Sequence, residues 1–404
     1  MAKIAVLGYG TVGSGVVEVL ETNAASITKK AGEAVEVKYV LDLRDFPGDP
    51  IQEKIVHDVD IIINDPEVSV VVEVMGGVEP ACTFVKKALE AGKSVCTSNK
   101  ALVAAHGPEL IAMAKEKNIN FMFEASVGGG IPIIRPLNQC LTADEVTQVT
   151  GILNGTTNYI LTKMSKEGCS YDETLKEAQA LGYAERNPEA DVEGHDACRK
   201  IAILTSLYTG KTVKFEEITT EGITKISTAD FKYAEKLGCV VKLLGTSRRD
   251  GDKVYAMTAP FMINASHPLY NVNDVINGVY VNGNMVGSLM FIGAGAGKLP
   301  TASAVVADIV DCVKHSGTNV ATIWSSEKLE LGATDDEVRS FFVRVKGDDE
   351  AAAKAAFGNI EVVKVEGIDG EFGFVTAEMS EKAYKEAAAK VEVINMIRLD
   401  KTVL

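Results

Sequence analysis

The densest group of ionisable side chains lies between Glu185 and Lys200, in the sequence ERNPEADVEGHDACRK. Asn187-Pro188 indicates a loop and Gly194 a further break, so we expect a helix to begin directly after Gly194. Asp196 and Lys200 then lie four residues apart on one face of that helix. A carboxylate beside an ammonium suits general acid/base work on a hydroxyl or a carbonyl. The same spacing is also that of an exposed ion pair, and the sequence leaves both interpretations open.

Other catalytic classes find less support in the sequence. The five histidines (57, 106, 195, 267 and 315) are dispersed, and none has the H-E-x-x-H spacing of a zinc site. No G-x-S-x-G elbow indicates a serine hydrolase. Cys198 is a lone cysteine, which is more typical of a small buried packing group than of a nucleophile.

A glycine-rich motif near the start of the sequence is the second feature that indicates chemistry. The apolar run Lys3–Leu7 leads into Gly8, Gly10 and Gly13 at G-x-G-x-x-G spacing, followed by a helical apolar pattern. In dinucleotide-binding folds the first glycine makes a tight turn, the second lets a pyrophosphate approach the backbone, and the third lets the helix pack on the strand. A glycine-rich turn in another kind of α/β protein is the alternative. The residues of this motif that we expect at a cofactor are Gly8, Gly10, Thr11, Val12 and Gly13.

Residues 1–135 alternate between strand-like and helical patterns, which predicts an α/β Rossmann-type, doubly wound parallel sheet. The expected strands after the first are 35–41, 60–63, 70–74, 94–97 and 120–125. Ligands bind beyond the carboxyl ends of such strands. The expected loop Ser98-Asn99-Lys100 and the segment from Glu124 to Gly130 are therefore of interest.

Two further domains are expected. Residues 136–324 mix long helices with strands and predict an α+β substrate and dimerisation domain. Within it, a glycine-rich loop at 293–297 precedes a helical pattern; the loop could approach a cofactor or could be a backbone crossing packed on glycine. We expect helix 301–320 to return to the first domain. After a polar linker, residues 338–404 show the βαββαβ order of a ferredoxin-like fold.

Composition narrows the location and the partners. The net charge is −15 without a basic block, which argues against nucleic acid as a partner. The seven cysteines are odd in number and scattered, which favours reduced thiols in a cytoplasm. No apolar stretch has the length of a membrane span, and the expected N-terminal strand argues against a signal peptide.

These motifs together resemble the homoserine dehydrogenases, over essentially the whole chain. The resemblance rests on the glycine motif, on Thr97-Ser98-Asn99-Lys100, and on the Asp191–Lys200 cluster. It also rests on EASVGGGIPI at 124–133, on GILNGTTNY at 151–159, and on the 293–297 loop. The resemblance implies NAD(P)-dependent interconversion of L-homoserine and L-aspartate 4-semialdehyde, on the route to threonine, methionine and isoleucine.

The resemblance also implies roles for individual residues. Lys200 would be the acid/base, while Glu185 and Asp196 would bind the substrate with support from Asp191. Lys100 would contact cofactor or substrate and counts among the catalytic residues. Further cofactor contacts are implied at Ser98, Gly182 and Gly297.

The Glu124 loop is similar to the family's structural site for a monovalent cation such as Na⁺, which implies ligands at Glu124, Val127, Gly129 and Ile131. The choice of cofactor stays open, because Asp42 could bind the ribose 2′-hydroxyl of NAD and Arg44 the 2′-phosphate of NADP; we favour NADP through Arg44.

The C-terminal segment resembles an ACT regulatory domain, but Lys346–Ala351 replaces the usual acid-x-Pro-Gly effector loop. We therefore expect it to serve assembly and not threonine inhibition. The family precedent implies a homodimer or homotetramer. The rival hypotheses are another Rossmann dehydrogenase acting on a related amino acid or aldehyde, and a non-catalytic dinucleotide sensor that would leave Lys200 on the surface.

Overall fold

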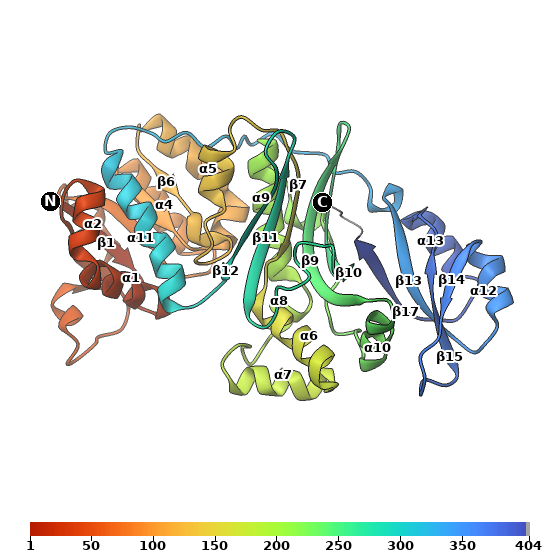
Figure 1. Cartoon of the computed structure of the whole chain (residues 1–404). Coiled ribbons are helices and arrows are strands. Elements are labelled where there is room, and N and C mark those ends of the chain that lie inside the picture. Colours follow the sequence, from red (N-terminus) through yellow and green to blue (C-terminus); the bar gives the residue numbers. More distant parts are fainter. Residues whose placement is uncertain (401–404) are drawn as a thin grey trace. The chain divides into compact units, whose positions relative to one another are not determined.

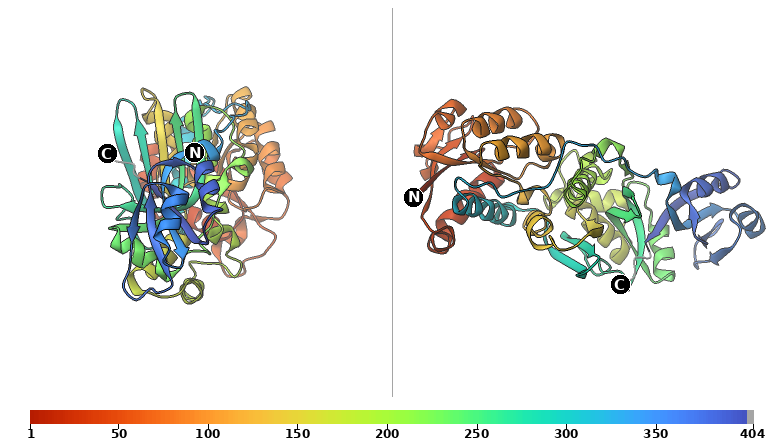
Figure 2. Two further views of the ribbon diagram at one scale, coloured as in Figure 1. Left: turned by 90° about the vertical axis from the view of Figure 1, so that its right-hand side faces the viewer. Right: turned by 90° about the horizontal axis from the view of Figure 1, so that it is seen from above.

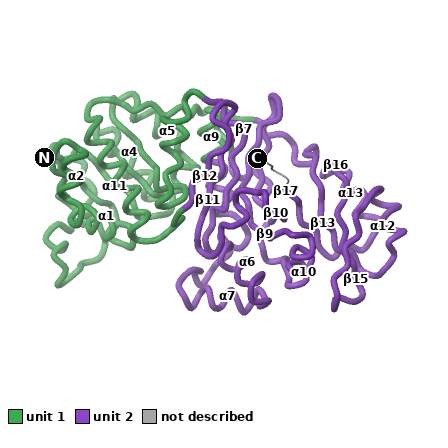
Figure 3. The backbone as a smooth tube through the Cα atoms, viewed as in Figure 1, with its two compact units in different colours: residues 1–143, 203–214, 293–329 green, residues 144–202, 215–292, 330–404 purple. Residues whose placement is uncertain are grey.

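The computed structural model describes residues 1–400 and contains two compact units, each built from three stretches of the chain (Figures 1 and 3). Unit 1 comprises residues 1–143, 203–214 and 293–329, and unit 2 comprises 144–202, 215–292 and the residues from 330 onward. The domain boundaries expected at 135 and 324 stay predictions.

Unit 1 is built on a six-stranded parallel sheet in the order β3-β2-β1-β4-β5-β6. Its strands are β1 (Ala2–Leu7), β2 (Val35–Leu41), β3 (Ile55–Val56), β4 (Val68–Glu73), β5 (Ser94–Thr97) and β6 (Phe121–Met122). Its helices are α1 (Thr11–Thr22), α2 (Ala24–Ala31), α3 (Val59–Ile63), α4 (Ala81–Glu90), α5 (Lys100–Glu116) and α11 (Lys298–Lys314). The strand order reverses between β1 and β4, as in doubly wound nucleotide-binding sheets. The predicted parallel Rossmann-like sheet is confirmed.

Three local predictions in this unit are wrong. The expected strand 120–125 is reduced to Phe121–Met122, because Glu124–Ser126 form a short 3-10 helix. Residues 60–63 form part of helix α3 and not a strand, because the Asp58 carboxylate accepts the Asp60 N–H and caps the helix. Short apolar runs do not distinguish a buried strand from a buried helical turn. Lys100 likewise begins helix α5 instead of lying in a loop, since the Asn99 side chain accepts the Leu102 N–H 3.1 Å away.

Helix α11 lies far from the other unit 1 helices in sequence, yet it packs directly against α1 (Figures 1 and 2). A Cβ atom on Gly15 of α1 would lie 2.8 Å from the Lys298 carbonyl oxygen and 3.1 Å from the Ala302 Cβ. Glycine at position 15 is therefore what allows this close approach of the two helices. The interface joins the buried core that contains Val16, Leu20 and Ile309.

Unit 2 contains one large mixed sheet whose main path is β12-β11-β7-β9-β10-β17-β13-β15-β14. Its strands are β7 (Val146–Ile152), β8 (Thr219–Thr220), β9 (Cys239–Asp250), β10 (Lys253–Asn264), β11 (Ile276–Gly283), β12 (Gly287–Ala294), β13 (Val338–Lys346), β14 (Ile360–Val363), β15 (Glu371–Thr376), β16 (Met379–Ser380) and β17 (Val393–Asp400). Its helices are α6 (Gly155–Glu167), α7 (Tyr171–Ala180), α8 (Glu189–Val192), α9 (His195–Thr209, whose last residues belong to unit 1), α10 (Thr228–Lys236), α12 (Glu350–Phe357) and α13 (Glu381–Ala388).

The C-terminal part of unit 2 follows the element order β13-α12-β14-β15-α13-β17, with the short strand β16 inserted before α13. Its sheet is continuous with the rest of the unit, because β17 pairs in parallel with β10 through Phe261 and Arg398. The identification of this βαββαβ segment as an ACT domain stays a prediction. Within residues 1–400, no helix has the length and apolar character needed to cross a lipid bilayer.

Candidate active site

The three glycines of the first loop have three distinct environments. Gly8 has a φ of +100°, which L side chains rarely adopt. A Cβ on Gly13 would lie 2.0 Å from the Gly8 carbonyl oxygen, whereas a Cβ on Gly10 would meet no atom within 4 Å. Helix α1 also begins at Gly10 without a side-chain cap on its first N–H groups. The loop thus leaves open space before an uncapped helix N-terminus, which suits the pyrophosphate of a dinucleotide.

A cavity of about 550 Å³ adjoins this loop at the carboxyl ends of β1, β2 and β4. It is lined by Gly8, Gly10, Leu41, Asp42, Leu43, Arg44, His57, Val59, Val74, Met75, Gly76, Pro80 and Phe84. The apolar side chains suit an adenine ring, and Asp42 and Arg44 come from the end of β2, where the ribose binds in this fold.

Asp42 and Arg44 line this cavity and contact each other. The Asp42 carboxylate accepts hydrogen bonds from the Tyr9 N–H and from the Arg44 Nε, both at 2.9 Å. The Arg44 side chain and the backbone N–H groups of Tyr9 and Arg44 hold the pKa of Asp42 well below its usual range. The Arg44 side chain is 63% exposed. An anion could therefore reach the guanidinium, while the Asp42 carboxylate is already engaged with the loop.

In unit 2, the sequence-predicted pair Asp196 and Lys200 is confirmed as a direct contact on α9. The Lys200 Nζ lies 2.7 Å from Asp196 Oδ2 and 2.7 Å from the Leu153 carbonyl oxygen. The two side chains are only 11% and 6% exposed, respectively, so the alternative of a solvated surface pair is wrong. An ammonium has three N–H groups, and these two acceptors leave one for a substrate oxygen.

Asn154 is a polar residue of this site to which the sequence analysis gave no role. Its Nδ2 donates to Asp191 Oδ1 at 2.7 Å and to Asp196 Oδ2 at 2.9 Å, while its Oδ1 accepts the Thr157 N–H and caps α6. One amide therefore holds two carboxylates close together. The signal available in the sequence was an Asn before a helical pattern, which predicts an N-cap and does not reveal the second function.

Three further substrate and cofactor candidates, Glu185, Gly182 and Ser98, lie in loops. Glu185 is exposed in the loop after α7. Gly182 ends the same helix with a φ of +76°. Ser98 follows β5, and its N–H donates to the Glu73 carbonyl oxygen at 3.4 Å. The implied roles of all three residues stay predictions.

The glycine-rich turn 128–130 packs against the second glycine-rich loop within unit 1. A Cβ on Gly129 would lie 2.5 Å from the Gly295 carbonyl oxygen, and the Gly130 N–H donates to the Ala294 carbonyl oxygen at 3.0 Å. The 293–297 loop therefore crosses the 128–130 turn with glycine at the contact, and whether it also approaches a cofactor stays a prediction. Gly297, with a φ of +119°, then begins α11, and its predicted cofactor contact remains to be tested.

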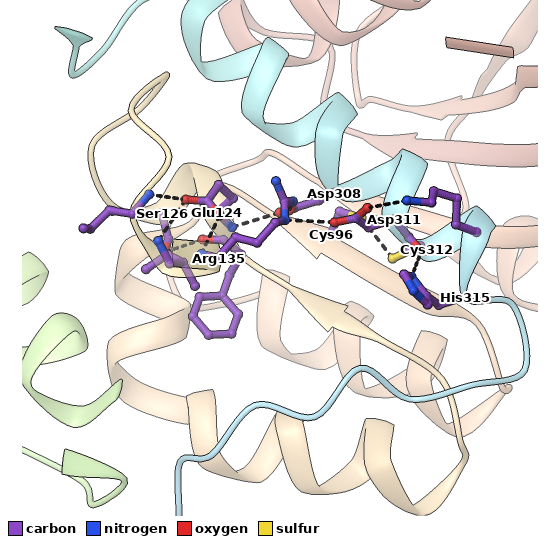
Figure 4. A network of polar contacts seen from close by, with 12 residues as sticks. Cys96, Glu124, Ser126, Arg135, Asp308, Asp311, Cys312 and His315 are labelled. Atoms are coloured by element: carbon purple, nitrogen blue, oxygen red, sulfur yellow. Dashed lines mark hydrogen bonds and ion pairs between the residues drawn. The ribbon is translucent and has the colours of Figure 1, made fainter. Parts of the chain in front are cut away.

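Glu124 belongs to a network of buried charges in unit 1 (Figure 4). Its carboxylate accepts the backbone N–H groups of residues 133, 134 and 135, and its own N–H donates to Asp308 on α11 at 2.8 Å. Arg135 in turn pairs with Asp308 and Asp311. Because the Glu124 side chain is engaged by these amides, a cation here would need main-chain carbonyl oxygens, which the predicted positions 124, 127, 129 and 131 could supply. No cluster of His, Cys, Asp and Glu side chains with metal-ligand geometry is found in residues 1–400.

A doubly wound sheet with an open glycine loop, together with a buried carboxylate–lysine pair, is typical of the nicotinamide-dependent dehydrogenases. The comparisons with known proteins narrow this class. The family model described as "Homoserine dehydrogenase, NAD binding domain" matches residues 8–124, and the model described as "Homoserine dehydrogenase" matches residues 132–310. The chain belongs to the homoserine dehydrogenase family and is an NAD(P)-dependent oxidoreductase.

Individual relatives agree with this assignment. The homoserine dehydrogenase of Bacillus subtilis is 41% identical over 87% of this chain and 82% of its own length. The crystal structure of a homoserine dehydrogenase from Thiobacillus denitrificans superposes with a TM-score of 0.92 at 35% identity, covering 99% of this chain and 98% of that one. A hyperthermophilic archaeal homoserine dehydrogenase in complex with NADPH has a TM-score of 0.66 at 25% identity, covering 80% and 99% of the two chains.

The Asp308 carboxyl yields a prediction about stability. Burial, reinforced by the nearby Glu124 carboxylate, raises the pKa of Asp308 to about 8. In the unfolded chain this carboxyl ionises near its ordinary value, so its contribution to stability is complete at low pH and is lost as the pH rises through about 8. As the pH rises from about 6 to about 9, we expect the Tm of the wild type to fall relative to the Tm of Asp308→Asn. Asp311→Asn, which removes another partner of Arg135, is the control, and a difference that does not change with pH would contradict the assignment.

Proposed function

We propose that this enzyme interconverts L-homoserine and L-aspartate 4-semialdehyde, with Lys200 as the acid/base, in the biosynthesis of threonine, methionine and isoleucine. The observation that carries the proposal is the buried contact of Lys200 with Asp196 and the Leu153 carbonyl oxygen. The nicotinamide cofactor supplies or accepts the hydride. In aldehyde reduction the Lys200 ammonium donates its remaining N–H to the developing alkoxide, and in alcohol oxidation the neutral amine accepts the hydroxyl proton.

The carboxylates around Lys200 suit the other end of the substrate. Homoserine carries an ammonium group, which requires anionic partners, and Asn154 holds Asp191 and Asp196 within reach of one amide. We assign Asp196 both to the orientation of Lys200 and to substrate binding, with Glu185 and Asp191 as further substrate ligands. Lys100, in the first turn of α5 in unit 1, is assigned to cofactor or substrate contact, and Ser98, Gly182 and Gly297 to the cofactor.

The surface sensor that would leave Lys200 in solvent does not fit the burial of this side chain. A Rossmann dehydrogenase of a different family does not fit the two family matches, which together span most of the chain.

Substitution of Lys200 tests the mechanism. We expect Lys200→Ala to lower kcat about a hundredfold or more and to leave the KM for the cofactor nearly unchanged, because a lost acid/base group affects proton transfer and not nucleotide binding. Lys166→Ala, at an exposed lysine of the same unit, is the matched control and should keep wild-type turnover. Turnover of Lys200→Ala within a few-fold of the wild type would remove Lys200 from the reaction.

We further propose that the enzyme favours NADP. Arg44 is exposed at the cavity that suits the adenosine half, whereas the Asp42 carboxylate is occupied by Tyr9 and Arg44. The archaeal relative crystallised with NADPH is consistent with such a site.

Arg44→Ala is expected to raise the KM for NADP about tenfold, because a charge-assisted contact to a phosphate is lost, and to change the KM for NAD less than about twofold. Lys30→Ala removes an exposed positive charge from the same unit outside the cavity and is the control. An unchanged ratio of the two KM values in Arg44→Ala would exclude Arg44 from cofactor selection.

We propose a structural monovalent cation, such as Na⁺, at the main-chain carbonyl groups of Glu124, Val127, Gly129 and Ile131. The tight turn supports this, since consecutive residues with φ of +76° and +54° at 128 and 129 can direct several carbonyl oxygens to one point. Replacing Na⁺ by tetramethylammonium at equal ionic strength should lower Tm, because only the folded state binds the ion. An equal Tm in both salts would contradict the proposal.

The remaining proposals concern assembly and location. We propose a cytoplasmic homodimer or homotetramer. Edge strand β12 supports a second copy as partner, since Ile292 on it is 57% exposed and Met285 in the preceding turn is 78% exposed. The C-terminal βαββαβ segment is proposed to be an ACT-like module that serves assembly.

A further inference from the structure

Arg398 on strand β17 is one of the most deeply buried side chains of unit 2, with 1% of its side chain exposed. Its Nη1 and Nη2 donate to the two carboxylate oxygens of Glu221 at 2.9 and 2.7 Å, and its Nε donates to Glu381 at 3.1 Å. This is a bidentate arginine–carboxylate pair, which fixes orientation as well as distance. It ties the C-terminal βαββαβ segment to the loop that follows strand β8.

Gly222, the residue after Glu221, contacts the backbone at the C-terminal end of helix α8. A Cβ on Gly222 would lie 2.2 Å from the Val192 carbonyl oxygen and 2.5 Å from the Glu193 Cα, so two backbones meet here without a side chain between them. The next residue, Ile223, donates its N–H to the same Val192 carbonyl oxygen at 2.8 Å. Residues 222 and 223 therefore contact the C-terminal end of helix α8 directly and restrict its position.

The turn at residues 192–194, which follows α8, also contacts Glu221. Gly194 has a φ of +82°, and a Cβ there would lie 3.3 Å from the Glu221 carbonyl oxygen and 3.2 Å from a methyl group of Thr258. The Glu221 N–H donates to the Thr258 carbonyl oxygen at 2.8 Å, which extends the parallel pairing of β8 with β10. The turn at 192–194 thus rests on a backbone whose position depends on β10 and on Arg398.

This turn joins the two carboxylates assigned to the substrate. Asp191 precedes it in α8, and Asp196 follows it in the first turn of α9, one helical turn before Lys200. A shift of the turn would move Asp191 relative to Asp196 and would strain the two hydrogen bonds that Asn154 donates to them.

We propose that Arg398 is a positioning residue for substrate binding: by holding Glu221 it fixes Gly222 against the turn at 192–194 and so sets the spacing of Asp191 and Asp196. The proposal rests on the proposed function, in which these carboxylates bind homoserine. It assigns the C-terminal segment a part in the active site that requires no effector. The Arg398 guanidinium is buried whereas the Glu221 side chain is 43% exposed, and both buried and exposed ion pairs are weak sources of net stability. A role in fixing geometry therefore accounts for this pair better than a role in stability alone.

Unit 2 offers a matched control. Arg344 on β13 is 7% exposed and also joins the C-terminal segment to the rest of the unit, through Asp230 on α10 at 2.8 Å and Glu371 at 2.8 Å. Ser227, at the N-cap of α10, is a further partner at 2.9 Å. Arg344 is thus a second deeply buried arginine with a bidentate carboxylate contact, but none of these partners belongs to residues 192–194 or 221–223.

The first test compares Arg398→Lys and Glu221→Gln with Arg344→Lys. Arg398→Lys keeps the positive charge but loses the bidentate contact, and Glu221→Gln keeps the side-chain shape but loses the negative charge. We expect Arg398→Lys and Glu221→Gln to raise the KM for homoserine about tenfold. Their kcat and their KM for NADP should stay within about threefold of the wild-type values. In the double variant the two effects should not add, because they act through one contact. Arg344→Lys should lower Tm comparably and leave the KM for homoserine within about twofold.

The second test avoids the buried charges. Gly222→Ala places a methyl group against Val192, so it should raise the KM for homoserine while the KM for NADP stays the same. Gly373→Ala, whose added methyl group would first meet the rings of Tyr233 and Phe342 and not the 192–194 backbone, is its control. A KM for homoserine that is unchanged in Arg398→Lys and Gly222→Ala, or raised equally in both controls, would overturn the proposal.

Failure of the proposed function gives a different result. Asp191→Asn with an unchanged KM for homoserine would show that this carboxylate does not bind the substrate. An effect of Asp191→Asn without an effect of Arg398→Lys would refute only the positioning role.

Discussion

In the mechanism we propose, the chemistry depends on one buried contact, the ion pair between Lys200 and Asp196. Two charges removed from water lose a large hydration free energy, and their mutual attraction compensates only when further hydrogen bonds complete the geometry. Here the Leu153 carbonyl oxygen accepts from the lysine and the Asn154 amide donates to the aspartate. These partners come from the end of β7 and the start of α6, so the large sheet and two helices must be in place before the lysine has a defined orientation.

Buried ionisable groups recur at the points where distant parts of the chain meet. Asp308 on α11 accepts from Arg135 and from the Glu124 backbone, which places the returning helix against the end of β6. Arg398 and Arg344 join the C-terminal segment to residues more than a hundred positions earlier in the sequence. Apolar cores supply most of the burial on both sides of these junctions, but an apolar surface does not define a unique register, whereas a paired guanidinium does.

The sequence predicted features that depend on local spacing. The glycine motif, the parallel sheet, the start of α9 after Gly194, and the pairing of Asp196 with Lys200 all follow from residues within one or two turns of each other. Burial of that pair did not follow, because the i,i+4 spacing is the same on an exposed and on a buried face. Asn154 was missed for a related reason: its two carboxylate partners lie about forty residues away. Helix α3 was mistaken for a strand, since capping by a single aspartate decided between two structures that the apolar pattern permits. Of the segments by which the two units interrupt each other, the return of helix 301–320 was expected from the sequence, whereas the assignment of residues 203–214 to unit 1 has no local signal.

The position of β17 has a consequence for how the protein is made. This strand ends the described chain, yet it lies inside the sheet of unit 2, between β10 and β13. Helix α11, which covers the core of unit 1, is likewise synthesised only after most of unit 2. During translation, the earlier segments therefore keep apolar surfaces and strand edges exposed until β17 has left the ribosome, which makes the nascent chain prone to association.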